Sequence, residues 1–358
     1  MDLKLNYKNV SNVSRRIPEL GMYQAAFSFN SVCQADCLGC CGYILNNPPE
    51  EMPLYKVKQA LHTLISEFKI EQVYISCSAE MTLRKDVVEI VKYVNSLEDC
   101  NSKLRVEEDT NARYIPEGFI EAVNINPYRY NIGISLWGGD EEDFIKYQGP
   151  GDFNKTVENI NKYISLLGVP PYITAPCITE EQFEKIASLM NKIANKHNLN
   201  FEVVYDGTLP NLCSLRESGT IPLLRRAYRS DEGVHYDEKI DVDKYTTNRC
   251  PYLFGGFIMD VWGNITPCHE ILTFKNKTGA DNHLNLSDDS IIGNIYDYEP
   301  FDLNAFNSIL HSEKARGVFE RNFIPGELPL ERCKNCGTRV SHWSPKLLKK
   351  VLDKKQSD

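Results

Sequence analysis

The sequence has no long apolar run, no excess of basic residues and no repeated or low-complexity segment. No stretch approaches the ~20 apolar residues that a membrane-spanning helix needs. Residues 1–16, MDLKLNYKNVSNVSRR, lack the apolar centre of a secretory signal peptide. We therefore predict a cytoplasmic protein with no membrane partner. The formal net charge of −9 also disfavours nucleic acid as a partner, because non-specific binding to phosphates needs an excess of positive charge.

What the sequence does contain is typical of a globular protein with metal chemistry. Its 358 residues are 42% hydrophobic and 25% charged, which suits a folded chain of about two domains. It has 12 cysteines. In a reducing cytoplasm thiols stay free, so metal binding or catalysis explains them better than a disulfide framework.

Short β-rich runs alternate with longer helical patterns from residue 23 onward. The predicted strands cover 23–30, 72–78, 103–109, 130–136, 172–178 and 201–206. The predicted helices cover 54–68, 86–97, 153–167 and 180–197. Such alternation indicates right-handed parallel crossovers and an α/β fold, a partial (β/α)6 TIM-like barrel. In barrels of this kind the chemistry lies at the carboxyl ends of the strands.

The pattern of predicted strands and helices divides the chain into five parts. Residues 1–22 form an N-terminal extension, 23–206 the partial barrel and 207–249 a mixed connector. From residue 250 the sequence pattern changes to short predicted strands and turns. This change predicts a small α+β domain over 250–345, followed by a basic tail over 346–358.

Three cysteines follow the first predicted strand at close spacing. Cys33-x3-Cys37-x2-Cys40 offers three thiolates from one loop. A tetrahedral zinc site would need a fourth protein ligand, and the adjacent Cys41 would strain the loop if it supplied one. A [4Fe–4S] cluster held by three cysteines instead leaves one iron open for a substrate or cofactor. Zinc stays open as an alternative at this point.

This arrangement resembles the radical S-adenosylmethionine superfamily. SCSAEM after the second strand is similar to the family's Gly-Gly-Glu stretch, DTNARY after the third to its Thr-Asn-Gly, and GISLWGG on the fourth to a segment whose serine approaches the cofactor. The aromatic residue that usually precedes the third cysteine is Gly39 in this chain. By this resemblance the residues expected to bind S-adenosylmethionine are Ser78, Ala79, Glu80, Thr110, Asn111 and Ser135.

The resemblance also implies a reaction. The cluster would pass an electron to S-adenosylmethionine, which cleaves to methionine and a 5′-deoxyadenosyl radical, and that radical takes a hydrogen atom from a substrate carbon. Glu80 would contact the cofactor's ammonium. An electron donor such as flavodoxin or ferredoxin is implied as a partner.

A second set of cysteines lies further along the chain, at Cys250, Cys268, Cys333 and Cys336. Four thiolates can close a zinc site or ligate an iron–sulfur cluster completely, and geometry alone favours neither. The spacing resembles the SPASM and twitch domains, with their auxiliary clusters. One auxiliary [4Fe–4S] cluster of the twitch type is therefore expected, and its role would be electron transfer.

Three functions follow from these patterns. The first is a radical oxidoreductase that dehydrogenates or epimerises a small polyol, sugar or aminosugar. The second is a maturase of a ribosomally made peptide, which crosslinks, epimerises or oxidises it. In an epimerase a cysteine returns hydrogen to the substrate, and Cys213 and Cys177 are the candidates. The third is a non-catalytic, zinc-stabilised protein. Arg216 could contact a substrate carboxylate or phosphate, but an exposed ion pair is favoured. Gln148 could either line the substrate cavity or pack its helix.

Overall fold

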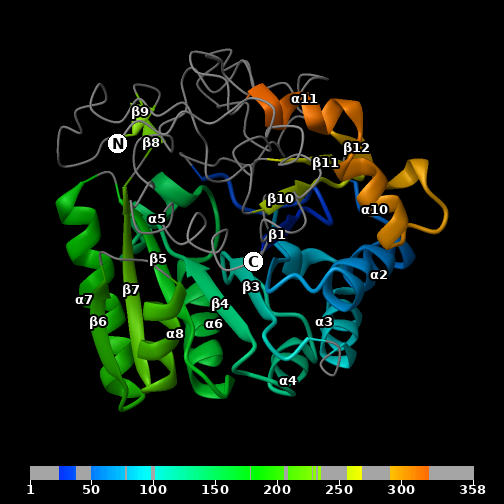
Figure 1. Cartoon of the computed structure of the whole chain (residues 1–358). Helices are drawn as coiled ribbons and strands as arrows, with labels where there is room; N and C mark the ends of the chain where they lie inside the picture. Colours follow the sequence, from blue (N-terminus) through cyan, green and yellow to red (C-terminus); the bar gives the residue numbers. More distant parts are fainter. Residues whose placement is uncertain are drawn as a thin grey trace, which may run out of the picture.

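Figure 1 shows the protein as a computed structural model. The structure describes residues 24–37, 50–76, 79–97, 101–177, 179–204, 209–227, 229–230, 233–234, 256–267 and 291–321. Over these residues, every helix is too short or too polar to cross a bilayer.

The fold is built on one ten-stranded sheet, in the order β12-β11-β10-β1-β2-β3-β4-β5-β7-β6. All neighbours from β10 to β6 pair in parallel, whereas β10–β11 and β11–β12 are antiparallel. The strands are β1 (Gln24–Phe27), β2 (Gln72–Tyr74), β3 (Arg105–Thr110), β4 (Tyr130–Ser135), β5 (Tyr172–Cys177), β6 (Asn200–Val204), β7 (Thr220–Ala227), β10 (Gly256–Met259), β11 (Asn264–Thr266) and β12 (Gly293–Asn294). A separate two-stranded ribbon pairs β8 (Arg229–Ser230) with β9 (Gly233–Val234).

Helices connect the parallel strands. Several begin at side chains that accept a hydrogen bond from the backbone three residues on, as Asp140, Asp152 and Thr179 do, which satisfies a donor that the helix leaves open. The described helices are α2 (Leu54–His62) continued by the π-helix η4 (Thr63–Glu67), η5 (Met81–Leu83), α3 (Val87–Ser96), α4 (Phe119–Val123), α5 (Glu141–Gln148), α6 (Phe153–Leu166), α7 (Glu180–Lys196), α8 (Leu209–Glu217), η9 (Ile295–Asp297), α10 (Leu303–Leu310) and α11 (Glu313–Arg321).

The predicted fold class is confirmed. All six predicted strands and all four predicted helices are present, with ends shifted by a few residues. The structure adds a helix, α8, and a further parallel strand, β7, within residues 207–249, where the sequence indicated only a mixed connector.

The two faces of the sheet differ in chemistry. Side chains alternate along a strand, so register partners share a face. One face presents Val73, Val106, Ile132 and Ile173, all at most 1% exposed, and packs in one core with side chains of α2, α3, α6 and α7. We call this the outer face. The opposite, inner face carries mostly polar groups, among them Gln72, Glu107, Asp109, Asn131, Ser135, Tyr172 and Thr174.

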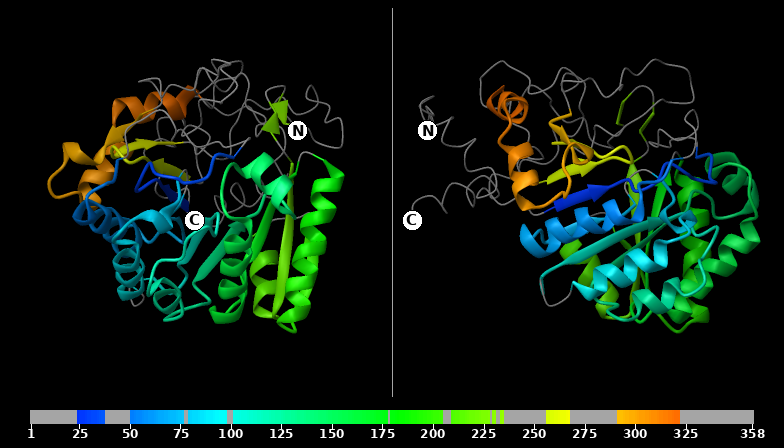
Figure 2. Two further views of the ribbon diagram at one scale, coloured as in Figure 1. Left: turned by 180° about the vertical axis from the view of Figure 1, so that it is seen from behind. Right: turned by 90° about the vertical axis from the view of Figure 1, so that its right-hand side faces the viewer.

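The strand order explains why α8 lies on the inner face. The chain moves outward from β1 to β5, passes one position to β6, and then steps back to β7. A right-handed crossover that runs backwards places its helix on the opposite side of the sheet. Accordingly, Leu212 of α8 packs against Tyr172 and Val204 in a small cluster separate from the main core. Figure 2 shows the curved sheet and its helices from two further directions.

The described part of the predicted auxiliary domain continues this architecture. Strand β10 pairs with β1, and Phe257 of β10 packs on Phe306 of α10, with ring centroids 5.1 Å apart. Phe306 also contacts Phe68, which follows η4. In Figure 1, β10 to β12 lie beside α10 and α11. Residues 256–267 and 291–321 thus share the sheet and core of the barrel.

Candidate functional site

Two of the three loop cysteines lie in the described part of the chain, on the segment that follows β1. Cys33 and Cys37 are both half-buried, whereas Cys40 lies outside the described residues. The Sγ of Cys33 accepts a hydrogen bond from the Ala35 backbone N–H at 3.4 Å and one from Asn111 Nδ2 at 3.7 Å. The thiol loop of β1 is therefore joined directly to the carboxyl end of β3.

Burial and the negative charge of Glu80 raise the pKa of the Cys33 thiol. The Ala35 N–H, Arg113 and Asn111 act in the opposite direction. A bound metal would shift this balance toward the thiolate, because metal binding displaces the thiol proton.

Glu80 is the hub of the site. It is 3% exposed, and its carboxylate accepts hydrogen bonds from Thr82 Oγ1 at 2.6 Å, Thr110 Oγ1 at 2.8 Å and the Asn111 backbone N–H at 2.8 Å. Burial raises the pKa of this carboxyl, and these hydrogen bonds, together with one from the Thr82 backbone N–H, oppose the rise. The side chain thereby connects the end of β2 to the end of β3.

The backbone of Glu80 reaches the thiol loop as well. Its N–H donates to the Val32 carbonyl at 3.0 Å, and its own carbonyl accepts from Asn30 Nδ2 at 3.1 Å. Of the neighbouring motif residues, Ala79 is described and Ser78 lies outside the described part. The structure thus brings Cys33, Glu80, Thr110 and Asn111 together.

Arg113 fastens the thiol loop to the segment after α5. Its guanidinium donates to the carbonyls of Gln34 at 3.2 Å, Pro150 at 2.6 Å, Gln148 at 2.8 Å and Gly149 at 3.0 Å, and it lies 4.8 Å from the centre of the Phe144 ring. Burial lowers the pKa of Arg113, while the nearby Cys37, Cys33 and Glu80 raise it. Arg113 was not among the predicted site residues, although its place two residues after Asn111 was a signal.

These residues fit an iron–sulfur cluster at the loop. Iron–sulfur clusters favour thiolate ligands with hydrogen bonds to sulfur, and Cys33 already has two such donors. A fixed guanidinium beside Cys33 and Cys37 would compensate the negative charge of thiolates. Cys33, Cys37 and Cys40 would hold the cluster.

Ser135 ends β4 on the inner face, beside the same rim. Its Oγ lies 3.1 Å from Thr174 Oγ1 on β5. Its carbonyl accepts a hydrogen bond from Gln148 Nε2 at 3.2 Å, and Gln148 Oε1 accepts one from the Trp137 N–H at 3.2 Å. Gln148 is fully buried. Gln148 therefore packs α5 against the end of β4. Of the two alternatives for this residue, the structure supports helix packing.

Cys213 is placed away from the rim. Its thiol donates to Asn131 Oδ1 at 3.4 Å, and Asn131 stands four residues before Ser135 on β4. At ~3.3 Å per residue this is ~13 Å along the strand. The structure therefore does not bring Cys213 together with the thiol loop. Cys177 ends β5, and its side chain lies outside the described part.

The exposed ion pair that the sequence favoured for Arg216 is wrong. Arg216 is 3% exposed, and its guanidinium donates to the Pro170 carbonyl at 2.5 Å, to the Tyr130 carbonyl at 3.1 Å and to Asn131 Oδ1. Burial lowers its pKa to about 10. The cause is the inward position of α8, which places Arg216 over the amino end of β4.

The four cysteines of the second set, Cys250, Cys268, Cys333 and Cys336, all lie outside the described residues. Between Cys250 and Cys268 in the sequence, the structure describes the tight β10–β11 turn. There Asp260 accepts hydrogen bonds from the backbone N–H groups of Trp262 at 3.0 Å and Asn264 at 2.9 Å.

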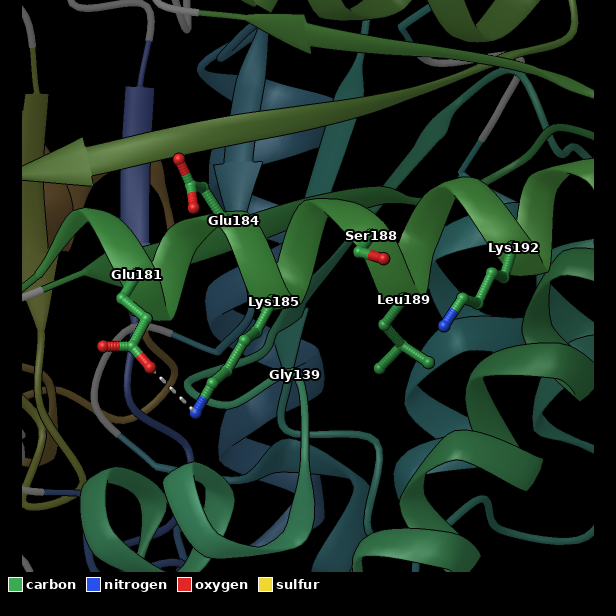
Figure 3. A pocket seen from close by; sticks show the side chains of 7 residues that line it. All are labelled: Gly139, Glu181, Glu184, Lys185, Ser188, Leu189 and Lys192. Carbon is green, nitrogen blue, oxygen red and sulfur yellow. Dashed lines mark ion pairs between the residues drawn. The ribbon is translucent and has the colours of Figure 1, made fainter.

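A surface pocket of ≈ 350 Å³ lies elsewhere, along α7 (Figure 3). Lys185 at its centre is 3.0 Å from Asp140, 3.0 Å from Asp143 and 3.7 Å from Glu181. Its charge is thus used in ion pairs between α7 and the start of α5. This pocket lies on the helix layer and contains none of the predicted site residues.

Comparisons with known proteins agree with the fold. The solved structure of SuiB from Streptococcus suis bound to S-adenosylmethionine superposes with a TM-score of 0.56 at 13% identity, covering 95% of this chain and 79% of SuiB. SuiB bound to its precursor peptide SuiA gives 0.51 at 12% identity, covering 93% and 82%. The enzyme anSMEcpe with bound AdoMet gives 0.51 at 14% identity, covering 88% and 84%.

These neighbours are radical S-adenosylmethionine enzymes, and this chain has their fold. The fold expected from the resemblance is therefore confirmed. No protein-family model matches the sequence, and no curated protein matches it significantly.

Proposed function

We propose that this protein is a radical S-adenosylmethionine enzyme that removes a hydrogen atom from a carbon of its substrate. The observation that carries the proposal is the thiol loop at the carboxyl end of β1, joined through Asn111 and Glu80 to the ends of β2 and β3. When bound, the cluster and S-adenosylmethionine would supply the electron and the hydrogen-abstracting group.

The chain's own residues would bind and orient the cofactor. Ser78, Ala79, Thr110, Asn111 and Ser135 would line its site. Glu80 already accepts hydrogen bonds from Thr82, Thr110 and the Asn111 backbone N–H. Its carboxylate would contact the cofactor's ammonium beside these donors. It would also hold Thr110 and Asn111 at the rim.

The proposal has two candidate substrate classes. The polar inner face supports a small polyol, sugar or aminosugar, which would be dehydrogenated or epimerised. The fold likeness to SuiB, solved with the precursor peptide SuiA, supports the second candidate, a maturase of ribosomal peptides. In either case an auxiliary [4Fe–4S] cluster on Cys250, Cys268, Cys333 and Cys336 would transfer an electron, and a flavodoxin or ferredoxin would be the donor.

The test is anaerobic reconstitution with iron and sulfide, followed by assay with dithionite and S-adenosylmethionine. We expect a brown protein with roughly eight irons, as two [4Fe–4S] clusters require, and formation of 5′-deoxyadenosine. Cys33→Ala should lower the iron content by about half and abolish 5′-deoxyadenosine, whereas the matched control Cys213→Ala should retain both. A colourless protein that binds zinc instead would reject the proposal and favour the zinc-stabilised alternative.

A further inference from the structure

Three neighbouring strands place Asp109, Gly133 and Tyr172 in one row on the inner face. Asp109 pairs in register with Gly133, and Gly133 pairs with Tyr172. The Tyr172 hydroxyl donates to Asp109 Oδ1 at 2.9 Å, passing over the glycine between them. The Asp109 carboxylate on β3 is thus bound by a side chain of β5, and this contact spans β4, the strand between them.

Gly133 makes this contact possible. A Cβ at this position would lie 2.2 Å from Asp109 Oδ1 and 2.5 Å from the Tyr172 hydroxyl. Glycine inside a strand weakens it and often marks a site of close approach. The side chains of Asp109 and Tyr172 occupy the space above Gly133, where they form their hydrogen bond.

The row lies next to the candidate cofactor site. Asp109 directly precedes Thr110 and Asn111, which bind Glu80 and contact Cys33. Its backbone N–H is fixed by Ser76 Oγ at 2.6 Å. The next row toward the rim contains Ser135 and Thr174. The Asp109 carboxylate therefore lies about two residues, or ~7 Å along the strand, below the rim.

The charge around Asp109 is unbalanced. Asp109 is half-buried, and the described ion pairs do not include it. The neighbouring carboxyl of Glu108 interacts with it electrostatically. Two of the described cations on this side, the half-buried Arg113 and the buried Arg216, donate to backbone carbonyls and to Asn131. Among the described residues, the donor to the Asp109 carboxylate is the neutral Tyr172 hydroxyl. A half-buried carboxylate with only neutral donors attracts a cationic hydrogen-bond donor strongly.

We propose that the Asp109–Tyr172 pair is a subsite that binds a primary ammonium group of the substrate. Tyr172 holds one carboxylate oxygen and orients the other toward the ligand. The ammonium of an aminosugar and that of a lysine side chain share this chemistry. The inference rests on the proposed function, because it places this group beside the carbon that reacts.

The test compares charged probes with neutral isosteres on the reconstituted holoenzyme with S-adenosylmethionine. One arm uses glucosamine against glucose, and the other Nα-acetyl-lysine methylamide against its norleucine analogue. Binding is measured by calorimetry and, separately, by stimulation of 5′-deoxyadenosine formation. We expect one ammonium probe to bind about 10- to 100-fold more tightly than its isostere, as a charge-assisted hydrogen bond provides. The arm that shows the preference identifies the source.

Asp109→Asn should abolish the preference while the iron content and the thermal midpoint stay near those of the wild type. If Asp109→Asn folds poorly, Asp109→Ser is tested in its place, and it should lose the preference equally. Tyr172→Phe should weaken binding of the ammonium probe yet keep the preference, because the charge of Asp109 remains. Equal binding of both members of each pair by the wild type, or a preference that survives in both Asp109 variants, overturns the proposal.

The two proposals fail in different ways. If the protein forms no 5′-deoxyadenosine with dithionite, the proposed radical chemistry fails, but calorimetry still decides whether Asp109 recognises ammonium. If 5′-deoxyadenosine forms and the binding preference is absent, only the subsite is rejected.

Discussion

Two adjacent carboxyl groups of β3 face opposite sides of the sheet, and their surroundings differ. Asp109 points to the inner face, where Tyr172 donates to it. Glu108 points to the outer face, is fully buried, and neither of its oxygens has a hydrogen-bond partner in the part of the chain that the structure describes. Burial, followed by the charges of Glu80 and Asp109, raises the pKa of Glu108 well above its ordinary value.

The difference shows how the fold separates stability from binding. The outer face is a packed apolar core, in which a carboxyl is tolerated only when it is protonated. Many polar groups of the inner face are bound from neighbouring strands and from α8, and several of them keep contact with solvent. A polar face inside a barrel is poor packing but suits a polar ligand.

The largest expected effect comes from removing the buried cation of the inner face. Arg216→Ala deletes three hydrogen bonds, leaves Asn131 Oδ1 with fewer donors and opens a cavity under α8. We expect the free energy of unfolding to fall by about 3–5 kcal/mol, measured by urea denaturation under anaerobic conditions. Arg316→Ala, on the exposed surface of α11, is the control and should change it little. Equal effects of the two variants would mean that α8 does not depend on Arg216.

A smaller loss is expected at Gly133. Gly133→Ala forces a methyl group against Asp109 and Tyr172, and overpacking of this kind lowers the free energy of unfolding by about 1–3 kcal/mol. Gly317→Ala is the matched control, because a Cβ there meets no atom within 4 Å. In the middle of α11 it should stabilise the protein by about 0.5–1 kcal/mol. Thermal midpoints that move in the same direction for both variants would contradict the close contact at Gly133.

The outer face was predictable from sequence, and the inner face was less so. Val, Ile and Phe runs of strand length identified β1 to β6, since strands of a parallel sheet that are covered by helices are rich in these residues. The strand-end rule placed Cys33 at the mouth of the barrel, whereas Glu80 and Asn111 were expected beside it only through the family resemblance.

The backward step from β6 to β7 could not be predicted in this way. Local patterns report which residues form a strand but not the order of strands in the sheet. Residues 209–217 have little periodic separation of polar and apolar side chains, so α8 gave a weak signal, and Arg216 looked like a surface residue. The row of Asp109, Gly133 and Tyr172 depends on register between strands that are far apart in sequence.

The next prediction concerns the carboxyl on the outer face. Glu108 keeps its proton in the native state above pH 4.5, its ordinary pKa, whereas the unfolded chain loses it there. The contribution of Glu108 to stability is therefore full below that pH and is lost as the pH rises toward the native pKa. Glu108→Met should raise the free energy of unfolding by about 1–2 kcal/mol at pH 8 and by less at pH 5. Urea midpoints at the two pH values check this, and a gain that is larger at pH 5 would contradict it.

The smallest effect is expected at a carboxylate that has good partners but no burial. Glu158 on α6 lies 2.9 Å from Lys155 and 2.8 Å from Lys162, and hydrogen bonds from Lys162 and Lys155 lower its pKa to about 2. Its contribution is present above the ordinary pKa and is lost as the pH falls toward 2, but water and salt screen an exposed pair. We expect Glu158→Gln to leave the urea midpoint at pH 7 and 0.15 M salt unchanged within error. A shift as large as that of Glu108→Met would show that burial is not what separates the two carboxyls.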